Sequence, residues 1–560
     1  MRLLDRACDK DFWAEVREKD CYARFRDENI ALWNNLCEGK EIPELTYSLF
    51  KIYFENGSRN EFEKAYFDRR KMMNACTFLS LIYPEEEKYF TYLQDVVFAV
   101  CNEYTWCLPA HYDQADHDKS LMVDLFAAET GFALAEIYTM LADRFEPLVA
   151  ARIRSEVERR IIEPYATKLN KLWWETGTNN WAAVCVGSVG GTLMLLFPER
   201  FEELRPRIEA TMECYLSGFS SDGFCVEGCG YWHYGFGFFT VYADMVKKFT
   251  SGEVDYFARP KVRAVATYIQ KMFLSDQIAV SFADSGMHLS YHLGLVHYLK
   301  SVYPDDVVVY DRALSYNYDN CARFCLHLRA ATWYREEYDT DALPNDTCEF
   351  FAEGAQWYIK KTSSYGFAAK GGHNKEPHNH NDIGSFIFAK NGVQILADPG
   401  TAMYTRDYFR GKRYTYFHAR TFGHSLPTFG GAEQKEGREY AARDTRVDGK
   451  DFVLDIAPAY GLDSLSKCER RFSFTETGVS ISDSFDYSGD GAIVERVVSM
   501  REPKKIEDGK IAILDSILTY DADAVESVNI IHQTFVGSAP CYTIDFTLKN
   551  GTEKFTYSIK

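Results

Sequence analysis

The sequence predicts a multidomain protein in which a helical part is followed by a β part. Before about residue 340, apolar residues recur every three or four positions, which is the period of an amphipathic helix. After about residue 350 the period is two, which is typical of half-buried strands. The chain ends with an alternating run over 544–548, the pair Asn550-Gly551 and a second alternating run over 555–559, which predicts an antiparallel hairpin. Helices first and strands second favour two domains in series over an alternating α/β sheet.

The boundary between the two domains is predicted within the charged stretch 335–349, which contains a proline and has no apolar period. This gives a helical domain over residues 1–340 and a β domain over residues 350–560. In the first domain, helices of similar length joined by glycine-containing loops suit a toroid of helical hairpins. The expected helical stretches are 60–82, 146–170, 180–197, 201–217, 231–250, 256–274 and 288–302.

Composition and charge exclude several classes of function. The 560 residues contain 63 Lys and Arg against 82 Asp and Glu, a net charge of −19 that repels nucleic acid and anionic membranes. No apolar run is long enough to predict a membrane helix, and the N-terminus lacks the apolar segment of a signal peptide, so we expect a cytoplasmic protein. The 15 Cys without a repeated spacing fit reduced thiols. The aromatic content of 15% is high, and such rings either line carbohydrate clefts or fill the core.

One segment of the β domain combines histidines with two predicted strands. The segment 377–382, PHNHND, precedes an apolar strand, a tight turn and a second strand that ends at Asp398. His378 and His380 are two residues apart and so face the same side of an extended chain. Together with His424, the residues His380 and Asp398 make a nitrogen and oxygen set suited to Zn²⁺. The alternative is that these are surface histidines in loops.

Three stretches of the helical domain combine aromatic rings with polar groups. Asn179 and Asn180 precede an apolar helix, where one of them is an expected N-cap. The glycine-rich loop 221–230 leads into the segment 231–234, YWHY, which would either point phenol and imidazole groups into a cleft or pack as an aromatic helix face. The stretch 106–112 has the rings and polar groups of a sugar-binding wall. With an arginine from the basic stretch FRGKRY, the candidate substrate-binding residues are Trp106, His111, Tyr112, Asn179, Trp181, Glu227, His233 and Arg413.

Five motifs follow one another between about residues 100 and 435. They are TNNWAAVC, DGFCVEGCGYWHYGFGFF, FADSG, HNHNDIGSFIFAKNGVQILADPG and RYTYFHARTFGHSLP. In sequence and in order they resemble the heparinase II/III family of polysaccharide lyases. The resemblance implies an incomplete (α/α) toroid followed by an antiparallel β-sandwich. It also implies that Asn180 engages a uronate carboxylate and that Tyr234 and His378 are catalytic. The implied zinc ligands are His380, Asp398 and His424. The sequence departs from many relatives in having GHSLP where they have an AHN-type sequence, and in lacking their secretion signal.

The activity implied by the resemblance is β-elimination next to a uronic acid. The reaction removes the proton alpha to the uronate carboxylate and expels the glycosidic oxygen, so the charge that develops on the carboxylate must be stabilised. The neutral amide of Asn180 can stabilise this charge, and His378 can take the proton. Tyr234 can protonate the leaving oxygen, and the alternative that it serves as both acid and base stays open. We expect a neighbouring His or Arg to lower its pKa. We expect zinc, mainly structural, and no organic cofactor.

The expected function is therefore a lyase that cleaves uronic-acid-containing glycans, first of all glycosaminoglycans of the heparin, heparan sulfate, chondroitin or hyaluronan type. An alginate or other polyuronate lyase is one alternative. A glycoside hydrolase with carboxylates such as Asp222, Glu227 and Asp284, or a non-catalytic carbohydrate-binding protein on the same scaffold, is the other. The expected partner is the acidic glycan, with no nucleic acid and no membrane, and a homo-oligomer stays open.

Overall fold

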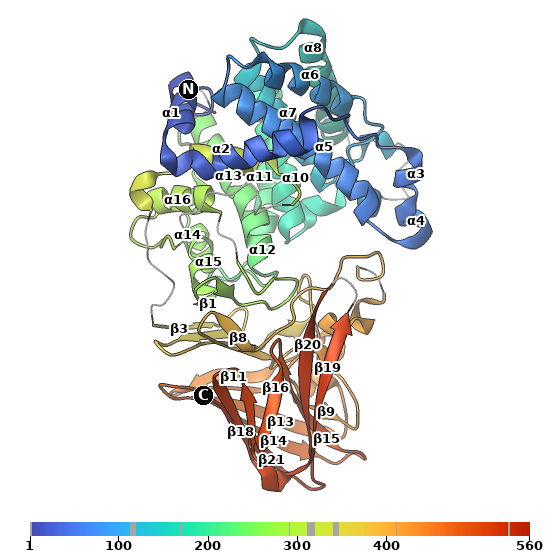
Figure 1. Cartoon of the computed structure of the whole chain (residues 1–560), viewed down its shortest axis with the longest axis vertical. Helices are drawn as coiled ribbons and strands as arrows, with labels where there is room; N and C mark the ends of the chain where they lie inside the picture. The colour runs from blue at the N-terminus through green and yellow to red at the C-terminus, as the bar shows by residue number, and fades with distance from the viewer. Residues whose placement is uncertain are drawn as a thin grey trace. The chain divides into compact units, whose positions relative to one another are not determined.

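The computed structural model describes residues 3–112, 119–167, 171–289, 292–310, 320–339, 347–409, 411–535 and 538–560 (Figure 1). The chain forms two compact units. The helical unit consists of Met1–Phe219, Trp232–Ala266 and Tyr291–Asp341. The β unit consists of Ser220–Tyr231, Thr267–Ser290 and Ala342–Lys560. Two short segments that precede residue 340 in the chain thus belong to the compact unit formed by the strands.

The helical unit consists mainly of α-helices, as the apolar period predicts. Its helices are α1 (Lys10–Glu18), α2 (Ala23–Leu32), α3 (Tyr47–Phe50), α4 (Ile52–Asn56), α5 (Asn60–Ile82), α6 (Glu87–Cys101), α7 (Leu125–Leu141), α8 (Pro147–Val157), α9 (Glu163–Thr167), α10 (Asn180–Leu196), α11 (Pro198–Ser217), α13 (Gly237–Phe249), α14 (Pro260–Ala266), α16 (Leu293–Val302) and α17 (Phe324–Thr332). The predicted stretches 60–82, 180–197 and 201–217 correspond to α5, α10 and α11. The prediction of a helix over 256–274 is wrong at its C-terminal end. There the chain passes through the short α15 (Tyr268–Lys271) into strand β1 (Phe273–Ser275).

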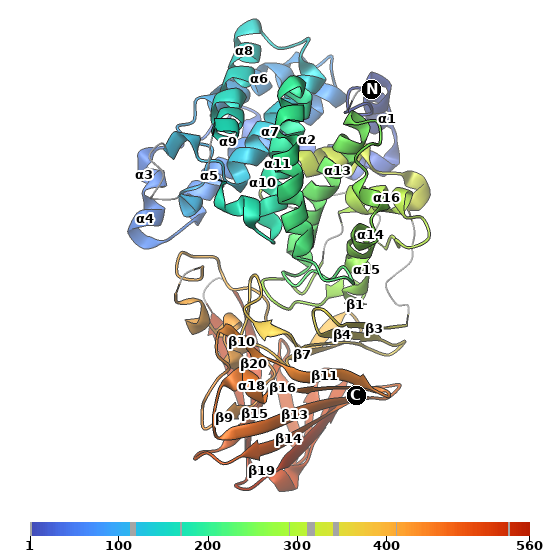
Figure 2. The ribbon, with the colours of Figure 1, turned by 180° about the vertical axis from the view of Figure 1, so that it is seen from behind.

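Helix α10 lies at the centre of the helical unit and packs against α7, α11 and α13 (Figure 2). Its sequence contains glycines where neighbouring rings approach its backbone. A Cβ at Gly191 would lie 2.4 Å from the ring of Phe132, and one at Gly190 would lie 2.7 Å from the ring of Tyr242. These glycines therefore allow a helix that is buried on nearly all sides, and the helix fixes the position of Asn180 at its first turn.

The β unit contains three larger antiparallel sheets. A five-stranded sheet has the order β3 (Cys348–Ala352), β4 (Trp357–Lys361), β5 (Gly366–Lys370), β7 (Phe386–Lys390) and β8 (Val393–Leu396). An eight-stranded sheet has the order β11 (Arg443–Asp448), β12 (Asp451–Asp455), β13 (Leu465–Phe474), β14 (Val479–Tyr487), β21 (Lys554–Ile559), β18 (Ser516–Tyr520), β17 (Lys510–Ile513) and β16 (Pro503–Glu507). A four-stranded sheet has the order β19 (Val525–Phe535), β20 (Ser538–Leu548), β15 (Ile493–Ser499) and β9 (Thr428–Phe429).

Smaller elements complete the β unit. Strand β1 pairs with β2 (Ile278–Ala279), and β10 (Gly437–Ala441) pairs with β6 (His373–Asn374). Short helices α12 (Cys229–Tyr231) and α18 (Ala457–Tyr460) lie between longer segments. One hydrophobic core joins the three larger sheets, with Phe386 from the first, Phe472 and Tyr557 from the second, and Val497 and Ile544 from the third. The predicted antiparallel sandwich is confirmed.

The two predicted hairpins have different outcomes. Strands β7 and β8 form a hairpin, and its turn residues Asn391 and Gly392 both have positive φ, as expected for this turn. The hairpin predicted at the C-terminus is wrong. Strand β20 pairs with β19 and β15, whereas β21 pairs with β14 and β18, so the chain crosses between two sheets at Asn550-Gly551. Alternating apolar residues face a shared core in either arrangement, so the pattern does not distinguish them.

Within the described residues, no helix combines the length and the apolar character that crossing a bilayer requires.

Candidate active site and metal group

A buried group of two histidines and one aspartate lies where the β7–β8 hairpin begins and ends. His380 precedes β7, Asp398 follows β8, and His424 follows a short 3₁₀ turn. One possible ligand atom from each of the three residues lies within 4.8 Å of the others, and all three side chains are fully buried. The alternative of surface histidines in loops is therefore wrong, and the three residues predicted as metal ligands lie together.

The hydrogen bonds of this group leave ligand atoms available. His424 Nδ1 lies 3.0 Å from Asp398 Oδ2, and the backbone N–H of Gly400 donates to Asp398 Oδ1 at 2.8 Å. In the part of the chain that the structure describes, His380 Nδ1 and His424 Nε2 have no hydrogen-bond partner. Unpartnered buried nitrogens are uncommon in folded proteins, and two of them beside a carboxylate fit a metal ion of the zinc type.

Asp284 connects this group to the predicted base His378. Its carboxylate lies 2.7 Å from His378 Nδ1 and 3.1 Å from His380 Nε2. It also accepts hydrogen bonds from the Tyr408 hydroxyl at 2.5 Å and from Arg413 Nη2 at 3.0 Å. Burial alone would raise the pKa of Asp284, but the hydrogen bonds from both histidines and the charge of Arg413 hold it well below its usual value. Asp284 is therefore a buried, ionised carboxylate.

His378 is held in an uncommon conformation. Its φ of +58° lies in the left-handed region, which non-glycine residues seldom adopt. Arg413 donates to the carbonyl oxygens of His378 at 2.8 Å and Asn379 at 2.7 Å, which fixes this turn. The imidazole stacks on the ring of Tyr231 with centroids 4.0 Å apart. Because Asp284 engages Nδ1, the nitrogen of His378 that remains to accept a proton is Nε2.

Tyr234, the predicted acid, lies in the helical unit with an ion pair. Its hydroxyl donates a hydrogen bond to Glu129 Oε1, and the guanidinium of Arg323 lies 3.7 Å from its ring centroid. Arg323 Nε lies 3.5 Å from Glu129 Oε2. Burial raises the pKa of Tyr234 well above its usual value and the Glu129 charge adds to this, whereas Arg323 acts in the opposite direction. The expected lowering of this pKa is wrong, because burial and a carboxylate outweigh the arginine.

Asn180 lies against the segment that carries Tyr234. Asn179 is the N-cap of α10, since its Oδ1 accepts a hydrogen bond from the backbone of Trp181 at 3.2 Å. The Asn180 side chain is buried, and its Oδ1 has no hydrogen-bond partner among the described residues. A Cβ built at Gly235 would lie 3.1 Å from Cβ of Asn180, so the two backbones approach closely. The structure thus places Asn180 beside the segment 232–236.

The predicted sugar-binding wall contains two partly buried residues and one that is fully buried. His111 Nδ1 lies 2.8 Å from Asp124, and its ring packs on Trp181 with centroids 4.8 Å apart. Tyr112 packs edge to face on Phe50 at 5.4 Å. Trp106, in contrast, is buried in the core and donates a hydrogen bond from Nε1 to a backbone carbonyl of α6 at 2.9 Å. Glu227 and His233 are also buried, the first in the β unit and the second in the helical unit.

Several residues around these groups were not assigned from sequence. Glu129, Arg323, Tyr404 and Tyr408 belong to no motif that the resemblance identifies. Tyr404 lies in the β unit with its hydroxyl 2.9 Å from that of Tyr231. Asp284 was noted only as a carboxylate for a hydrolase, although the motif FADSG that contains it was a signal.

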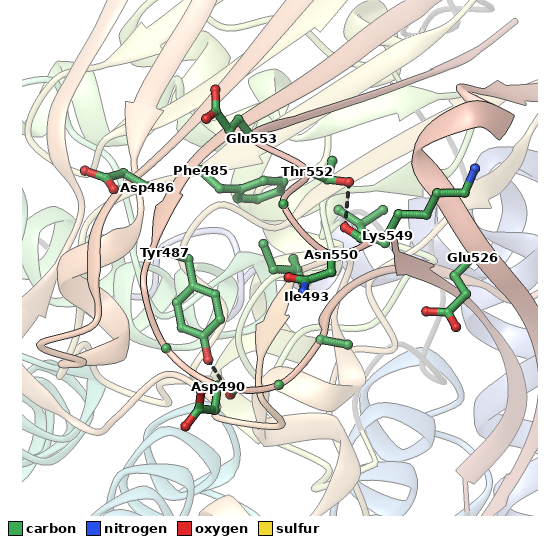
Figure 3. A pocket seen from close by; sticks show the side chains of 15 residues that line it. Phe485, Asp486, Tyr487, Asp490, Ile493, Glu526, Lys549, Asn550, Thr552 and Glu553 are labelled. Atoms are coloured by element: carbon green, nitrogen blue, oxygen red, sulfur yellow. Dashed lines mark hydrogen bonds between the residues drawn. The ribbon is translucent and has the colours of Figure 1, made fainter.

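A polar hollow of about 740 Å³ in the β unit contains none of the predicted site residues (Figure 3). It lies between the turns 485–493 and 548–553. Its charged lining residues are Lys549 and four acids, Asp486, Asp490, Glu526 and Glu553. Carboxylates in this excess repel a uronate, so this hollow does not suit the expected substrate.

Residues 358–538 match the sequence model of the family described as Heparinase II/III-like, C-terminal. The C-terminal domain is heparinase II/III-like. The resemblance found in the motifs is confirmed by this match, which includes His378, His380, Asp398 and His424. A search of curated proteins gives no match to the chain.

Several solved structures of lyases have a fold similar to that of this chain. A heparinase III structure has a TM-score of 0.62 at 14% identity and covers 90% of this chain and 77% of that one. A mutant of the heparan sulfate lyase HepC from Pedobacter heparinus has a TM-score of 0.60 at 13% identity, over 95% of this chain and 82% of its own. The chondroitin AC lyase of Streptomyces coelicolor A3, in complex with chondroitin sulphate, has a TM-score of 0.56 at 11% identity, over 98% and 82%. The similarity confirms the predicted fold class, a helical region followed by antiparallel sheets.

Proposed function

We propose that this chain is a polysaccharide lyase that cleaves uronate-containing glycans, first of all glycosaminoglycans, by β-elimination. The proposal depends on one observation. The buried carboxylate of Asp284 engages Nδ1 of His378, a residue of the heparinase II/III-like domain, and leaves Nε2 to act as a base. The similar folds of a heparan sulfate lyase and a chondroitin AC lyase support this choice of reaction. The helices of the first unit would form the incomplete toroid of such lyases.

In the proposed reaction, His378 Nε2 takes the proton from the carbon next to the uronate carboxylate. The electron pair of that bond forms a carbon–carbon double bond, and the bond from the neighbouring carbon to the glycosidic oxygen breaks. The amide of Asn180 stabilises the charge that develops on the uronate carboxylate, without the repulsion that an acidic side chain would cause. The products are a shortened glycan and a fragment that ends in an unsaturated uronate.

Tyr234 donates the proton that the leaving oxygen needs. Its raised pKa keeps the phenol protonated at neutral pH, which suits an acid better than a base. The phenolate that remains is stabilised by the guanidinium of Arg323, 3.7 Å from the ring centroid, and not by the Glu129 carboxylate, and it regains a proton from water before the next turnover. The assignment of acid and base to two residues differs from a mechanism in which one tyrosine does both.

We propose zinc for the group of His380, Asp398 and His424, with a mainly structural role. The unpartnered nitrogens His380 Nδ1 and His424 Nε2 and the carboxylate of Asp398 supply ligand types that zinc prefers. A bound zinc would supply a cross-link between three segments. His380 would then orient Asp284 through its other nitrogen, and Asp284 would orient His378.

The hydrolase alternative is less well supported. Asp284 accepts hydrogen bonds from four side chains and has a strongly lowered pKa, so it is poorly suited to donate a proton to a leaving oxygen. An alginate or other polyuronate lyase stays an alternative, because all these polymers present the same carboxylate to the reaction.

The experiment that tests the function compares Tyr234→Phe with Tyr242→Phe on a panel of heparan sulfate, chondroitin, hyaluronan and alginate oligosaccharides. Release of unsaturated uronate is followed by its ultraviolet absorbance. Tyr234→Phe should lower turnover by roughly 10²-fold or more, the usual scale for loss of an acid, and should keep substrate affinity. Tyr242→Phe is the matched control, because it removes a buried hydroxyl that has no hydrogen-bond partner among the described residues. Equal turnover of the two variants would exclude Tyr234 as the acid.

A further inference from the structure

An aromatic hollow lies in the helical unit, apart from the residues assigned to the reaction. Its lining includes five aromatic residues, Tyr47, Phe50, Phe62, Tyr104 and Tyr112, and also Glu103. Its volume is about 380 Å³, within the range of about 300–1,000 Å³ for small-molecule sites. We propose that this aromatic hollow binds a sugar ring of an acidic glycan, away from the bond that is cleaved. This inference rests on the proposed function for the identity of the glycan.

Two of the rings are exposed to an unusual degree. The exposed fraction is 78% for Tyr47 and 66% for Tyr104. These rings come from separate segments, α3 and the turn after α6, yet both border the same hollow. Behind them Phe50 contacts Phe62 at 5.6 Å and Tyr112 at 5.4 Å between centroids, so the inner rings are held by one another. Exposed rings above a fixed aromatic floor offer the flat apolar faces that sugar C–H groups stack on.

Glu103, the one charged residue among the described residues that line the hollow, is paired with two arginines. Glu103 accepts a hydrogen bond from Arg70 Nη2 at 2.8 Å, and its Oε1 lies 3.0 Å from Arg69 Nε. All three side chains are nearly fully buried, with exposed fractions of 7% or less. Two guanidinium groups therefore neutralise the Glu103 carboxylate, so the residue is not expected to repel an acidic glycan. This differs from the hollow of Figure 3, which has four carboxylates and one lysine.

Contacts within the helical unit connect the hollow to the residues proposed for the reaction. Tyr112, in the hollow, follows His111 in the chain, and the His111 ring packs on Trp181. Trp181 follows Asn180, which is proposed to bind the reacting uronate. A glycan whose uronate lies at Asn180 can therefore follow these rings toward the hollow, and longer oligosaccharides should gain contacts that short ones lack.

The test measures glycan binding by titration calorimetry in a Tyr234→Phe background, so that the ligand is not consumed. The ligands are a heparan sulfate and a chondroitin sulfate decasaccharide, each with its tetrasaccharide. The double substitution Tyr47→Ala and Tyr104→Ala should weaken decasaccharide binding roughly tenfold, equivalent to about 1.4 kcal/mol, and should leave tetrasaccharide binding unchanged. Leu148→Ala is the control, because this exposed side chain on α8 lies outside the hollow.

The binding results test the hollow, whereas release of unsaturated uronate tests the proposed function. Equal decasaccharide affinities of the double variant and of Leu148→Ala would overturn the inference, even if the chain with Tyr234 intact releases unsaturated uronate. Failure of the intact hollow to bind either decasaccharide would also overturn it. Selective loss of decasaccharide binding in a chain that releases no unsaturated product would support the hollow and contradict the lyase proposal.

Discussion

Asp284 links the candidate base to the candidate metal group. It contacts His378 and His380, which are 94 and 96 residues further along the chain. No spacing rule relates positions so far apart, so the sequence identified both histidines but not the carboxylate that orients them. The same holds for Glu129, which lies 105 residues before its partner Tyr234. The candidate site was thus predictable as a set of residue types, whereas its buried partners required the fold.

The role of Asp284 can be tested by Asp284→Asn. The amide keeps the size of the side chain but removes the charge that fixes the proton on His378 Nδ1, so the wrong imidazole nitrogen becomes the acceptor. Turnover should fall by roughly 10²-fold or more, and KM should change little, because the substrate-binding groups stay in place. Steady-state kinetics on one defined oligosaccharide measures both values.

The matched control for that variant is Asp276→Asn, an exposed position in the same chain segment. It should retain normal turnover. If Asp284→Asn changes KM but leaves turnover intact, this carboxylate does not position His378 for catalysis as we propose.

At the scale of helices and strands, the apolar period was a reliable guide to the type of element. Helices α5 and α10 and the hairpin of β7 and β8 appear where the pattern predicted them. The pairing of strands was less predictable, because β20 and β21 alternate like a hairpin but belong to different sheets. Such pairing depends on which neighbours share the core, and a local pattern contains no information about those neighbours.

Helix α16 contains a histidine that should make the stability of the helical unit depend on pH. His297 is fully buried, and its Nδ1 accepts a hydrogen bond from the backbone of Arg335 at 3.0 Å. Burial lowers the pKa of His297 to about 4 from an ordinary value of 6.5. Between these pH values the unfolded chain binds a proton that the folded chain does not. Stability should therefore fall as the pH drops from 6.5 to 4, by about 3 kcal/mol at the lower end.

The measurement compares thermal unfolding of the natural chain and His297→Gln at pH 7 and pH 5. The glutamine can still accept the hydrogen bond but does not titrate in this range. Acidification from pH 7 to pH 5 should lower the Tm of the natural chain more than that of the variant. Identical losses would show that another group is responsible for the acid sensitivity.

At the scale of the whole molecule, the two compact units should respond differently to metal removal. The candidate ligands His380, Asp398 and His424 all belong to the β unit. A metal bound only by the folded chain stabilises it, so a strong chelator should lower the unfolding temperature of the β unit and leave that of the helical unit unchanged. Calorimetry combined with elemental analysis measures both effects, and we expect one zinc per chain.

The control for chelation is His424→Ala, which should unfold at a lower temperature and show no further response to the chelator. Carefully purified protein without stoichiometric metal, or a chelator effect that persists in His424→Ala, would contradict the assignment of these three ligands.

The central claim is that the chain breaks a glycosidic bond by elimination, and the source of oxygen in the products tests it most directly. Elimination adds no water, whereas a hydrolase adds one water molecule across each bond that it breaks. The reaction is run in water enriched in heavy oxygen with the uronate oligosaccharide that the chain cleaves fastest, and the products are weighed by mass spectrometry. The account predicts fragments whose masses sum to that of the substrate, one of them with an unsaturated uronate, and no label introduced by bond cleavage. Fragments that together weigh one water more than the substrate, with the heavy oxygen incorporated at the cleaved bond, would contradict it.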